Sequence, residues 1–183
     1  MRKRGQKVIV ITSVGENEGK STVAANLAIS MAEKEKKVVL LDCDFRKPSM
    51  HKIFETEVPR SNTLSAYLLG ETQEYLTEVK KHGISVGFSQ HSHRNIASFL
   101  NGGKLEETLE ALRKQADYII LDTPPMLAAA DAEALAAIAD TALVITRADF
   151  MPVDMINDGL ERLEKSAKNV CGIVLNDYHK GLL

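Results

Sequence analysis

The fold of this chain is decided by residues 8–22, VIVITSVGENEGKST. Residues 8–13 form a continuous, mostly β-branched run, which is typical of a buried strand. The residues after Thr22 are rich in alanine and indicate a helix. A strand, a loop that ends in Gly-Lys-Ser and a helix, in this order, are the context that a phosphate-binding P-loop requires. The stretch therefore predicts a site for ATP or ADP between the first strand and the first helix.

The loop residues have distinct predicted roles. Gly19 lets the backbone approach a phosphate without a Cβ in the way, and free N–H groups at the helix start attract the anion. We expect Lys20 to reach the β- and γ-phosphates and Ser21 to bind Mg²⁺, while Thr22 contacts the α-phosphate. The nucleotide-binding residues predicted in the loop are Gly15, Glu16, Asn17, Glu18, Gly19, Lys20, Ser21 and Thr22.

The loop departs from the strict P-loop pattern at one position. That pattern has a glycine five residues before Gly19, where this chain has Val14, and Gly15 comes one residue late. The alternative is an ordinary strand-to-helix turn that happens to contain Gly-Lys-Ser. The strand before the loop, the lysine, the two hydroxyls and the alanine-rich helix together favour a P-loop.

Short apolar runs alternate with longer segments of helical period along the rest of the chain. The predicted strands are 8–11, 38–41, 84–88, 118–121, 142–145 and 170–175, and the predicted helices are 21–34, 64–69, 73–80, 105–114, 131–139 and 152–165. Most of the strands lack polar alternation, as strands buried on both faces do. The pattern predicts one α/β domain over residues 1–183, a P-loop NTPase-like three-layer fold with a mostly parallel sheet and helices on both faces.

Composition excludes several classes of function. A net charge of −2 over 183 residues gives no field to attract nucleic acid, and we expect no such partner. No run approaches the ~18 apolar residues of a spanning helix, so we expect a soluble, cytoplasmic chain. Cys43 and Cys171 lie in or beside apolar runs and are expected to be small buried side chains. His91 and His93, among polar residues, indicate a solvated loop and not a metal site.

Aspartates follow two of the predicted strands. Asp42 and Asp44 end the second strand and, being two residues apart, point to the same face. Asp122 ends the strand at 118–121. Ligands bind at the carboxyl edge of open parallel sheets, and Mg²⁺ prefers oxygen ligands. The metal ligands predicted from these features are therefore Ser21 and Asp122, with Asp42 and Asp44 at the same edge of the sheet.

Three segments resemble the motifs of one family. Residues 12–22, 42–48 and 117–125 are similar, in order and spacing, to the Walker A, Walker A′ and Walker B motifs of bacterial tyrosine kinases. These cytoplasmic kinases govern capsule and exopolysaccharide export. The Asp-x-Asp-x-Arg-x-Pro element at 42–48 is the most specific of the three. Residues 64–71 and 172–176 also resemble family segments, so the likeness covers nearly the whole chain.

The resemblance implies transfer of the γ-phosphoryl group of ATP to tyrosine, with Mg²⁺. Asp42 would accept or orient the tyrosine hydroxyl, and Asp44 and Asp122 would complete the Mg²⁺ shell, so that Asp44 is added to the predicted metal ligands. Arg46 would steady the loop or the transferring group, and Asn176 would read the adenine edge. The implied catalytic residues are Lys20, Asp42, Asp44 and Arg46. The implied partners are a protein tyrosine substrate and a membrane-anchored polysaccharide co-polymerase, which would hold the chain at the inner face of the plasma membrane. A homo-oligomer is a further implied state.

Parts of the family pattern are missing. The C-terminal stretch has one tyrosine, Tyr178, where family members have several, and no Glu-x-x-Arg-x-x-Arg helix precedes the first strand. The element expected as Asn-Pro-x-Glu-Leu-Leu appears as NIASFL at residues 95–100. Self-phosphorylation and ring formation are therefore left open.

Two other functions remain as alternatives. A Min/Par-type ATPase switch shares the fold, but its marker is a second lysine five residues before Lys20, where this chain has Gly15. A catalytically silent ATP-binding regulator of a polysaccharide-export partner is the other alternative. Arg46 and Asp131 also have a plainer interpretation, because either can cap a helix or form a surface ion pair.

Overall fold

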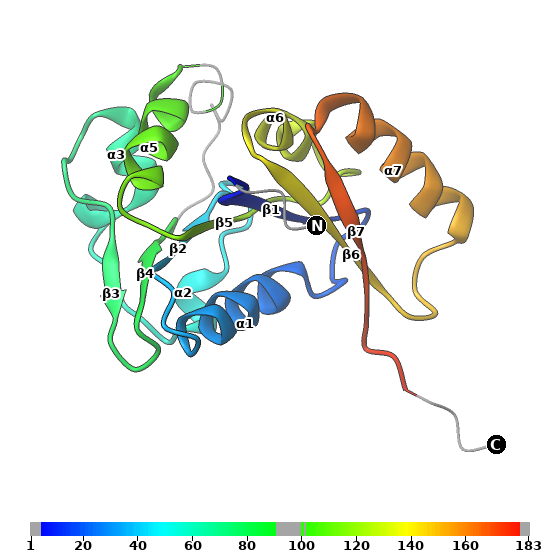
Figure 1. Cartoon of the computed structure of the whole chain (residues 1–183), viewed down its shortest axis with the longest axis horizontal. Coiled ribbons are helices and arrows are strands. Elements are labelled where there is room, and N and C mark those ends of the chain that lie inside the picture. Colours follow the sequence, from blue (N-terminus) through cyan, green and yellow to red (C-terminus); the bar gives the residue numbers. More distant parts are fainter. Residues whose placement is uncertain (1–4, 91–99, 101, 180–183) are drawn as a thin grey trace.

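The computed structural model describes residues 5–90, 100 and 102–179, which form one central sheet covered by helices (Figure 1). The strands are β1 Val8–Ser13, β2 Val38–Asp42, β3 Thr77–Val79, β4 Ile84–Gly87, β5 Tyr118–Asp122, β6 Thr141–Arg147 and β7 Val170–Asn176. Their order across the sheet is β3-β4-β2-β5-β1-β6-β7. β3 pairs antiparallel with β4, and every other pair is parallel.

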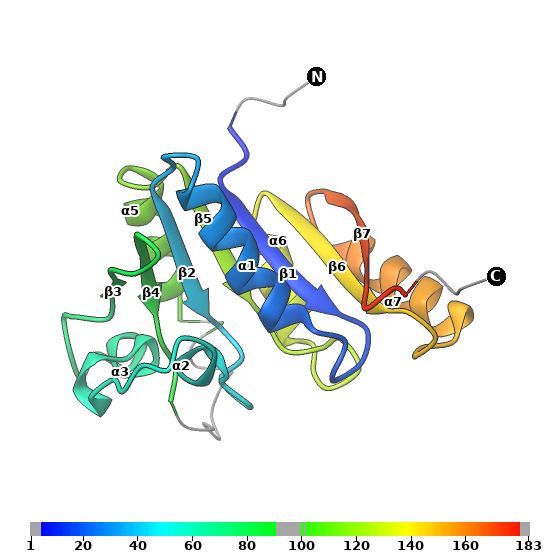
Figure 2. The ribbon, with the colours of Figure 1, turned by 90° about the horizontal axis from the view of Figure 1, so that it is seen from below.

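Helices cover both faces of this sheet. α1 (Lys20–Ala32) and the short α2 (Met50–Ile53) lie on one face, as the view from below shows (Figure 2). The opposite face carries α3 (Leu64–Leu69), α5 (Lys104–Arg113), α6 (Asp131–Ile138) and α7 (Val153–Ser166). A 3₁₀ turn, η1, spans Arg60–Asn62. The predicted three-layer α/β fold of P-loop NTPase type is thereby confirmed.

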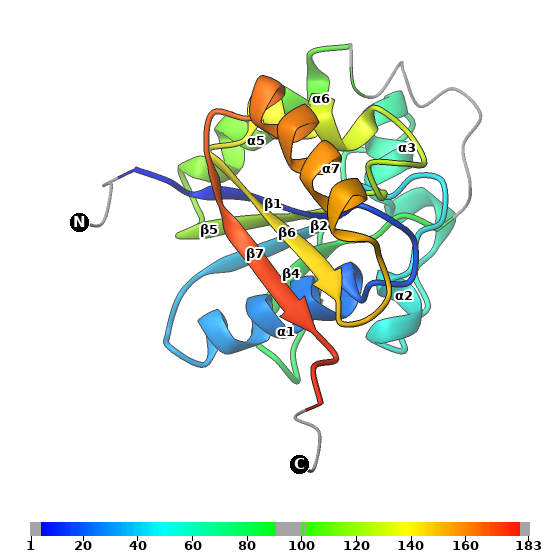
Figure 3. The ribbon, with the colours of Figure 1, turned by 90° about the vertical axis from the view of Figure 1, so that its right-hand side faces the viewer.

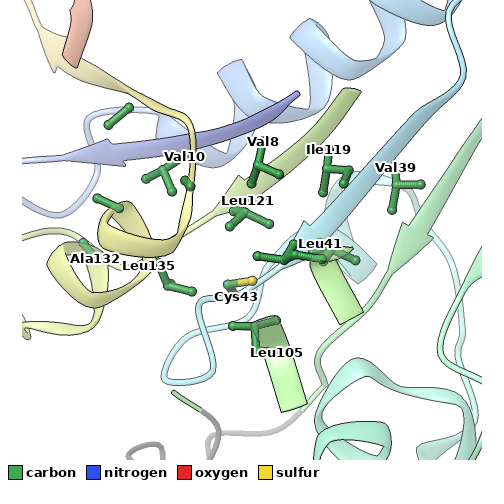
Figure 4. Close-up of a cluster of buried hydrophobic side chains, with 14 of the residues drawn as sticks. Val8, Val10, Val39, Leu41, Cys43, Leu105, Ile119, Leu121, Ala132 and Leu135 are labelled. Carbon is green, nitrogen blue, oxygen red and sulfur yellow. The ribbon is translucent and has the colours of Figure 1, made fainter. Parts of the chain in front are cut away.

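Alternating strand residues supply two separate cores. Val8 and Val10 of β1 belong to the core under α5, α6 and α7, whereas Ile11 belongs to the core under α1. The first of these cores includes Leu41, Leu121 and Leu135 (Figure 4). Because both faces of β1, β2 and β5 are covered, their side chains are apolar without alternation, as the sequence predicted.

The segment between β2 and β4 was only partly predicted. The helix expected at 64–69 is confirmed; the Thr63 hydroxyl accepts the Ala66 N–H at 3.2 Å, and Gly70 ends it at a φ of 80°. The helix expected at 73–80 is wrong, because this segment contains β3. Thr77 and Val79 are half-buried and Glu78 is exposed, which is the alternation of an edge strand that completes the pairing of β4.

β7 is the other edge of the sheet (Figure 3). Its residues alternate between half-buried and exposed, so it lacks the two-sided burial of the inner strands. Cys43 is buried, as expected, but Cys171 is exposed on β7, and the expectation that both are buried is wrong. His91, His93 and residues 95–99 lie outside the described residues. No helix within the described ranges is long and apolar enough to cross a membrane.

Candidate functional site

The loop between β1 and α1 is shaped by residues with left-handed backbone. Asn17 has a φ of 62° and Gly19 a φ of 88°, and Gly19 immediately precedes α1. A Cβ on Gly19 would overlap the side-chain amide of Asn176 on β7. Glycine is therefore needed here both for its backbone conformation and for the close approach of another strand.

A cavity of ≈380 Å³ lies against this loop. The predicted site residues that line it are Glu16, Asn17, Gly19, Lys20, Ser21, Thr22, Asp44 and Arg46. The predicted site residues that do not line it are Gly15, Glu18, Asp42, Asp122 and Asn176. Lys47, Ser49, Ile53, Pro124, Pro125 and Ala128 complete its wall. The N-terminus of α1 borders the cavity, as an anion site requires.

Lys20 joins the three predicted motifs. Its Nζ lies 3.2 Å from Asp44 Oδ2 and 4.0 Å from Asp122 Oδ1, and it donates to the Ser21 hydroxyl at 3.1 Å. Burial lowers the pKa of Lys20, but the charges of Asp122 and Asp44 outweigh this effect and raise that pKa above its ordinary value. The ammonium group is thus held charged where the β- and γ-phosphates would bind.

Asp42 and Asp122 are register partners on adjacent strands, and both are fully buried. Asp42 Oδ2 accepts the backbone N–H groups of Ser49 and Met50 at 3.1 and 3.0 Å. Burial, the charge of Asp122 and that of Asp44 raise the pKa of Asp42 well above its ordinary range, against the effect of those N–H groups. Burial also raises the pKa of Asp122 to about 6, although the Lys20 charge and the nearby Ser21 hydroxyl lower it.

The residues at this point fit a bound Mg²⁺. Neither Asp122 oxygen, nor Asp42 Oδ1, has a hydrogen-bond partner among the described residues, and unpartnered buried oxygens suit a cation. The charges of three carboxylates act on Lys20, and the other nearby cation, Arg46, is paired with Asp131, so positive charge is in deficit. No three His, Cys, Asp or Glu side chains of the described chain form a metal site alone. Mg²⁺ in phosphate sites usually needs only one or two carboxylates beside phosphates and waters.

Two ion pairs flank the mouth of the cavity. Arg46 pairs with Asp131 through two contacts of 2.8 and 3.2 Å, so the plainer interpretation of these two residues, a surface ion pair, describes their contact. Lys47 Nζ contacts both Glu16 oxygens, at 2.7 and 2.8 Å. Reasoning from the sequence did not single out Lys47, although it lies inside the Walker A′ segment and its charge was a signal.

The loop is also held by hydrogen bonds from residues that do not line the cavity. The Glu18 carboxylate accepts the Gly15 N–H at 2.7 Å and the Thr146 hydroxyl at 3.1 Å, and the Glu18 carbonyl accepts the Asn176 amide at 3.0 Å. Val14, which replaces the expected glycine, is completely buried. No motif marked Thr146, because a threonine near the end of a strand carries no recognisable signal.

Comparisons with known proteins agree with this geometry. The profile of a family described as ParA, NUBPL iron-transfer P-loop NTPase, matches residues 4–179. Tyrosine-protein kinase YwqD of Bacillus subtilis is 34% identical over 94% of this chain and 73% of its own length. Tyrosine-protein kinase CpsD of Streptococcus agalactiae is 30% identical over 96% and 77%. The chain belongs to the bacterial tyrosine-protein kinase family.

Other members of this kinase family are much longer. A putative tyrosine-protein kinase in the cps region of Klebsiella pneumoniae is 32% identical over 94% of the chain, which spans only 24% of that protein. The kinase domain of Escherichia coli tyrosine kinase ETK superposes with a TM-score of 0.88 at 26% identity, covering 99% of this chain and 72% of that one. The septum site-determining protein MinD of Pyrococcus horikoshii, complexed with Mg-ADP, shares the fold at 20% identity and a TM-score of 0.82, over 97% and 75%.

Proposed function

We propose that this chain is a protein-tyrosine kinase domain that transfers the γ-phosphoryl group of Mg-ATP to a tyrosine hydroxyl. One observation carries the proposal: Asp44 of the Walker A′ segment lies 3.2 Å from Lys20 in the phosphate loop, beside Asp122 of the Walker B strand. In this arrangement the proposed phosphate-binding lysine and Asp44 of the kinase-specific motif line one cavity, and Asp122 lies 4.0 Å from that lysine.

The proposed reaction is a direct displacement. The tyrosine oxygen bonds to the γ-phosphorus as the bond from that phosphorus to the β–γ bridging oxygen breaks, and ADP leaves. Loop N–H groups and Lys20 hold the phosphates, while Ser21, Asp44 and Asp122 would hold Mg²⁺. The metal neutralises charge on the phosphates. Arg46, which lines the cavity, would steady the loop or the group in transfer.

Asp42 is the proposed acceptor of the tyrosine proton. A phenol has a pKa near 10, so a carboxylate with a raised pKa accepts its proton more readily than an ordinary one. Burial raises the pKa of Asp42, and its Oδ1 has no hydrogen-bond partner among the described residues. Asp42 lies behind the cavity wall and Asp44 in it, so Asp44 is the carboxylate that would meet the ligand first.

The wider setting is part of the proposal. The substrate would be a protein tyrosine, and the product would regulate capsule or exopolysaccharide synthesis. A membrane-anchored polysaccharide co-polymerase, as a separate partner or as another part of the same protein, would hold this domain at the inner face of the plasma membrane. The cps-region relative, of which the chain spans 24%, supports the second of these options, in which the membrane-anchored part belongs to the same protein. Assembly into a homo-oligomer belongs to the same proposal.

The test is to incubate the purified chain with Mg-ATP and a tyrosine-rich peptide and to measure phosphotyrosine and free phosphate together. Lys20→Met and Asp42→Asn should each abolish phosphotyrosine. Asp117→Asn is a matched control, because Asp117 accepts the Lys37 N–H at the other end of the sheet. Phosphate without phosphotyrosine would support the Min/Par-type switch, and neither product would support a silent regulator.

A further inference from the structure

The side chain of Glu18 points into the protein, unlike those of its loop neighbours. Glu16 and Asn17 are exposed and line the cavity, whereas Glu18 is only 1% exposed and does not line it. The predicted role of Glu18 as a nucleotide ligand would therefore have to come from its backbone. Its carboxylate must have another function.

That carboxylate joins the start of the loop to a strand of the sheet. One oxygen accepts the Gly15 N–H at 2.7 Å and the other accepts the Thr146 hydroxyl of β6 at 3.1 Å. No Lys, Arg or His of the described residues lies within ion-pair distance of it. Burying a carboxylate without a cation is costly unless hydrogen bonds compensate. These two hydrogen bonds offset that cost, and they direct the Gly15 N–H away from the cavity.

Asn176 controls the other end of the loop. Its side-chain N–H donates to the Glu18 carbonyl at 3.0 Å. A trans peptide is planar, so its C=O and N–H point in opposite directions. With the Glu18 carbonyl aimed at β7, the N–H of Gly19 points away from β7, and Gly19 borders the cavity. Asn176 thus sets the direction of an amide that is placed to meet phosphate.

We propose that Glu18, Thr146 and Asn176 are positioning residues that hold the phosphate loop in its anion-binding shape from inside the protein. Glu18 and Thr146 hold Gly15, and Asn176 orients the Glu18–Gly19 peptide. The inference rests on the nucleotide-binding part of the proposed function and does not depend on transfer to tyrosine. It also gives Asn176 a role that differs from contact with the adenine edge.

The chain contains a matched control for two of these residues. At the opposite end of β6, Asn169 donates to the Thr141 hydroxyl at 2.7 Å, again linking β6 to the β7 region. Thr141 is 7% exposed and Thr146 5%. Thr146→Val and Thr141→Val therefore remove the same group at similar burial, and Asn176→Ala can be compared with Asn169→Ala.

The experiment measures the Mg-ADP dissociation constant by calorimetry and the melting temperature without nucleotide. We expect Thr146→Val and Asn176→Ala each to weaken Mg-ADP binding on the order of tenfold, since each loses one loop-holding hydrogen bond. Thr141→Val and Asn169→Ala should leave the constant within about twofold at a similar loss of melting temperature. The proposal would be overturned if the control variants weakened Mg-ADP binding as much as Thr146→Val and Asn176→Ala do, or if Thr146→Val left Mg-ADP binding unchanged. A wild-type chain that does not bind Mg-ADP would instead refute the proposed function.

Two further variants sharpen the test. Glu18→Gln keeps an oxygen that can accept the Gly15 N–H. It should therefore bind Mg-ADP far more tightly than Glu18→Ala, which loses the contacts to both Gly15 and Thr146. Inorganic triphosphate with Mg²⁺ has no base, so Asn176→Ala should weaken its binding as much as that of ADP. If only ADP binding falls, Asn176 reads the base and its positioning role is refuted.

Discussion

Val14 leaves no room for a side chain on Gly159: a Cβ built on Gly159 of α7 would lie 2.9 Å from Val14 Cγ2. Val14 stands where the strict P-loop pattern has glycine, and its side chain is completely buried. The glycine that allows close packing at this point is therefore on the helix and not in the loop. The departure at position 14 thus has a structural explanation.

Gly159→Leu should destabilise the protein by about 1–3 kcal/mol, because the added side chain overpacks against Val14 and Met126. Gly159→Ala should cost less, since alanine favours a helix by about 1 kcal/mol over glycine. Urea unfolding measures both. Glu161→Ala on the exposed side of α7 is the control and should stay within about 0.5 kcal/mol. A Gly159→Leu protein as stable as wild type would show that the contact is not tight.

Asp140 should make stability depend on pH in the acid range. Burial raises the pKa of Asp140, but Arg113 and the N–H groups of Val8 and Lys7 outweigh it and lower that pKa to about 2. The folded pKa is below the unfolded one, so the stabilisation is present above about pH 4 and is lost as the pH falls towards 2. It amounts to about 1–2 kcal/mol.

The free energy of unfolding of wild type and Asp140→Asn should therefore differ at pH 6 and converge towards pH 2. Asp117→Asn is the control variant, because it removes a carboxylate that accepts one exposed backbone N–H, whereas Asp140 also pairs with Arg113. A difference between wild type and Asp140→Asn that stays constant from pH 6 to pH 2 would argue against a charge effect.

Asp122→Asn should stabilise the nucleotide-free protein at pH 7 by about 1–3 kcal/mol. Burial raises the pKa of Asp122 to about 6, above its unfolded value, so keeping this carboxylate charged at pH 7 costs stability. The same variant should lose most of the stabilisation that Mg-ADP confers. Thermal unfolding with EDTA and with Mg-ADP measures both effects. A variant less stable than wild type in EDTA would contradict the assignment of this cost to Asp122.

Substitution of Ile53 should weaken binding of the acceptor tyrosine and leave binding of the nucleotide unchanged. It is 39% exposed, and with Pro124, Pro125 and Ala128 it forms an apolar part of the cavity wall that suits a tyrosine ring. Ile53→Ala should raise KM for a tyrosine peptide by about 3–10-fold, since an Ile-to-Ala change removes apolar contact area. Its Mg-ADP affinity should stay unchanged. Leu69→Ala, an exposed apolar residue away from this cavity, is the control. Weaker Mg-ADP binding by Ile53→Ala would assign this wall to the nucleotide.

The parts of the fold with strong local signals were predictable. The inner strands were continuous apolar runs, and the short helix at 64–69 had a threonine cap and a terminal glycine. The strand at 77–79 was not predicted, because Gln and Glu before it favour a helix, and three residues are too few to show a clear strand pattern. Its antiparallel pairing with β4, which follows directly in the chain, decides its conformation. The exposure of Cys171 also depended on strand order, which places β7 at the edge.

The sequence predicted many of the residues that line the cavity, but not the directions in which the loop side chains point. Spacing predicted that Asp42 and Asp44 share a face, and the 3.2 Å contact between Asp44 and Lys20 agrees with the expected meeting of motifs. Sequence spacing carries no information about which loop side chains turn inward. The inward turn of Glu18 depends on Thr146, 128 residues away, and the approach of Asn176 depends on β7 reaching the loop.

The position of Asn176 at the end of β7 links order at the sheet edge to ligand occupancy. An edge strand is held on one side only, so it opens at a lower free energy than an inner strand. A ligand that holds the Gly19 amide in place also holds the Glu18 carbonyl, which accepts the hydrogen bond from Asn176. By thermodynamic linkage, ligand binding stabilises the end of β7, and order at the end of β7 strengthens ligand binding to the same extent. The rate at which β7 amide hydrogens exchange with solvent would then report whether the distant phosphate loop is filled. A molecule that bound along β7 would change nucleotide affinity without touching the nucleotide.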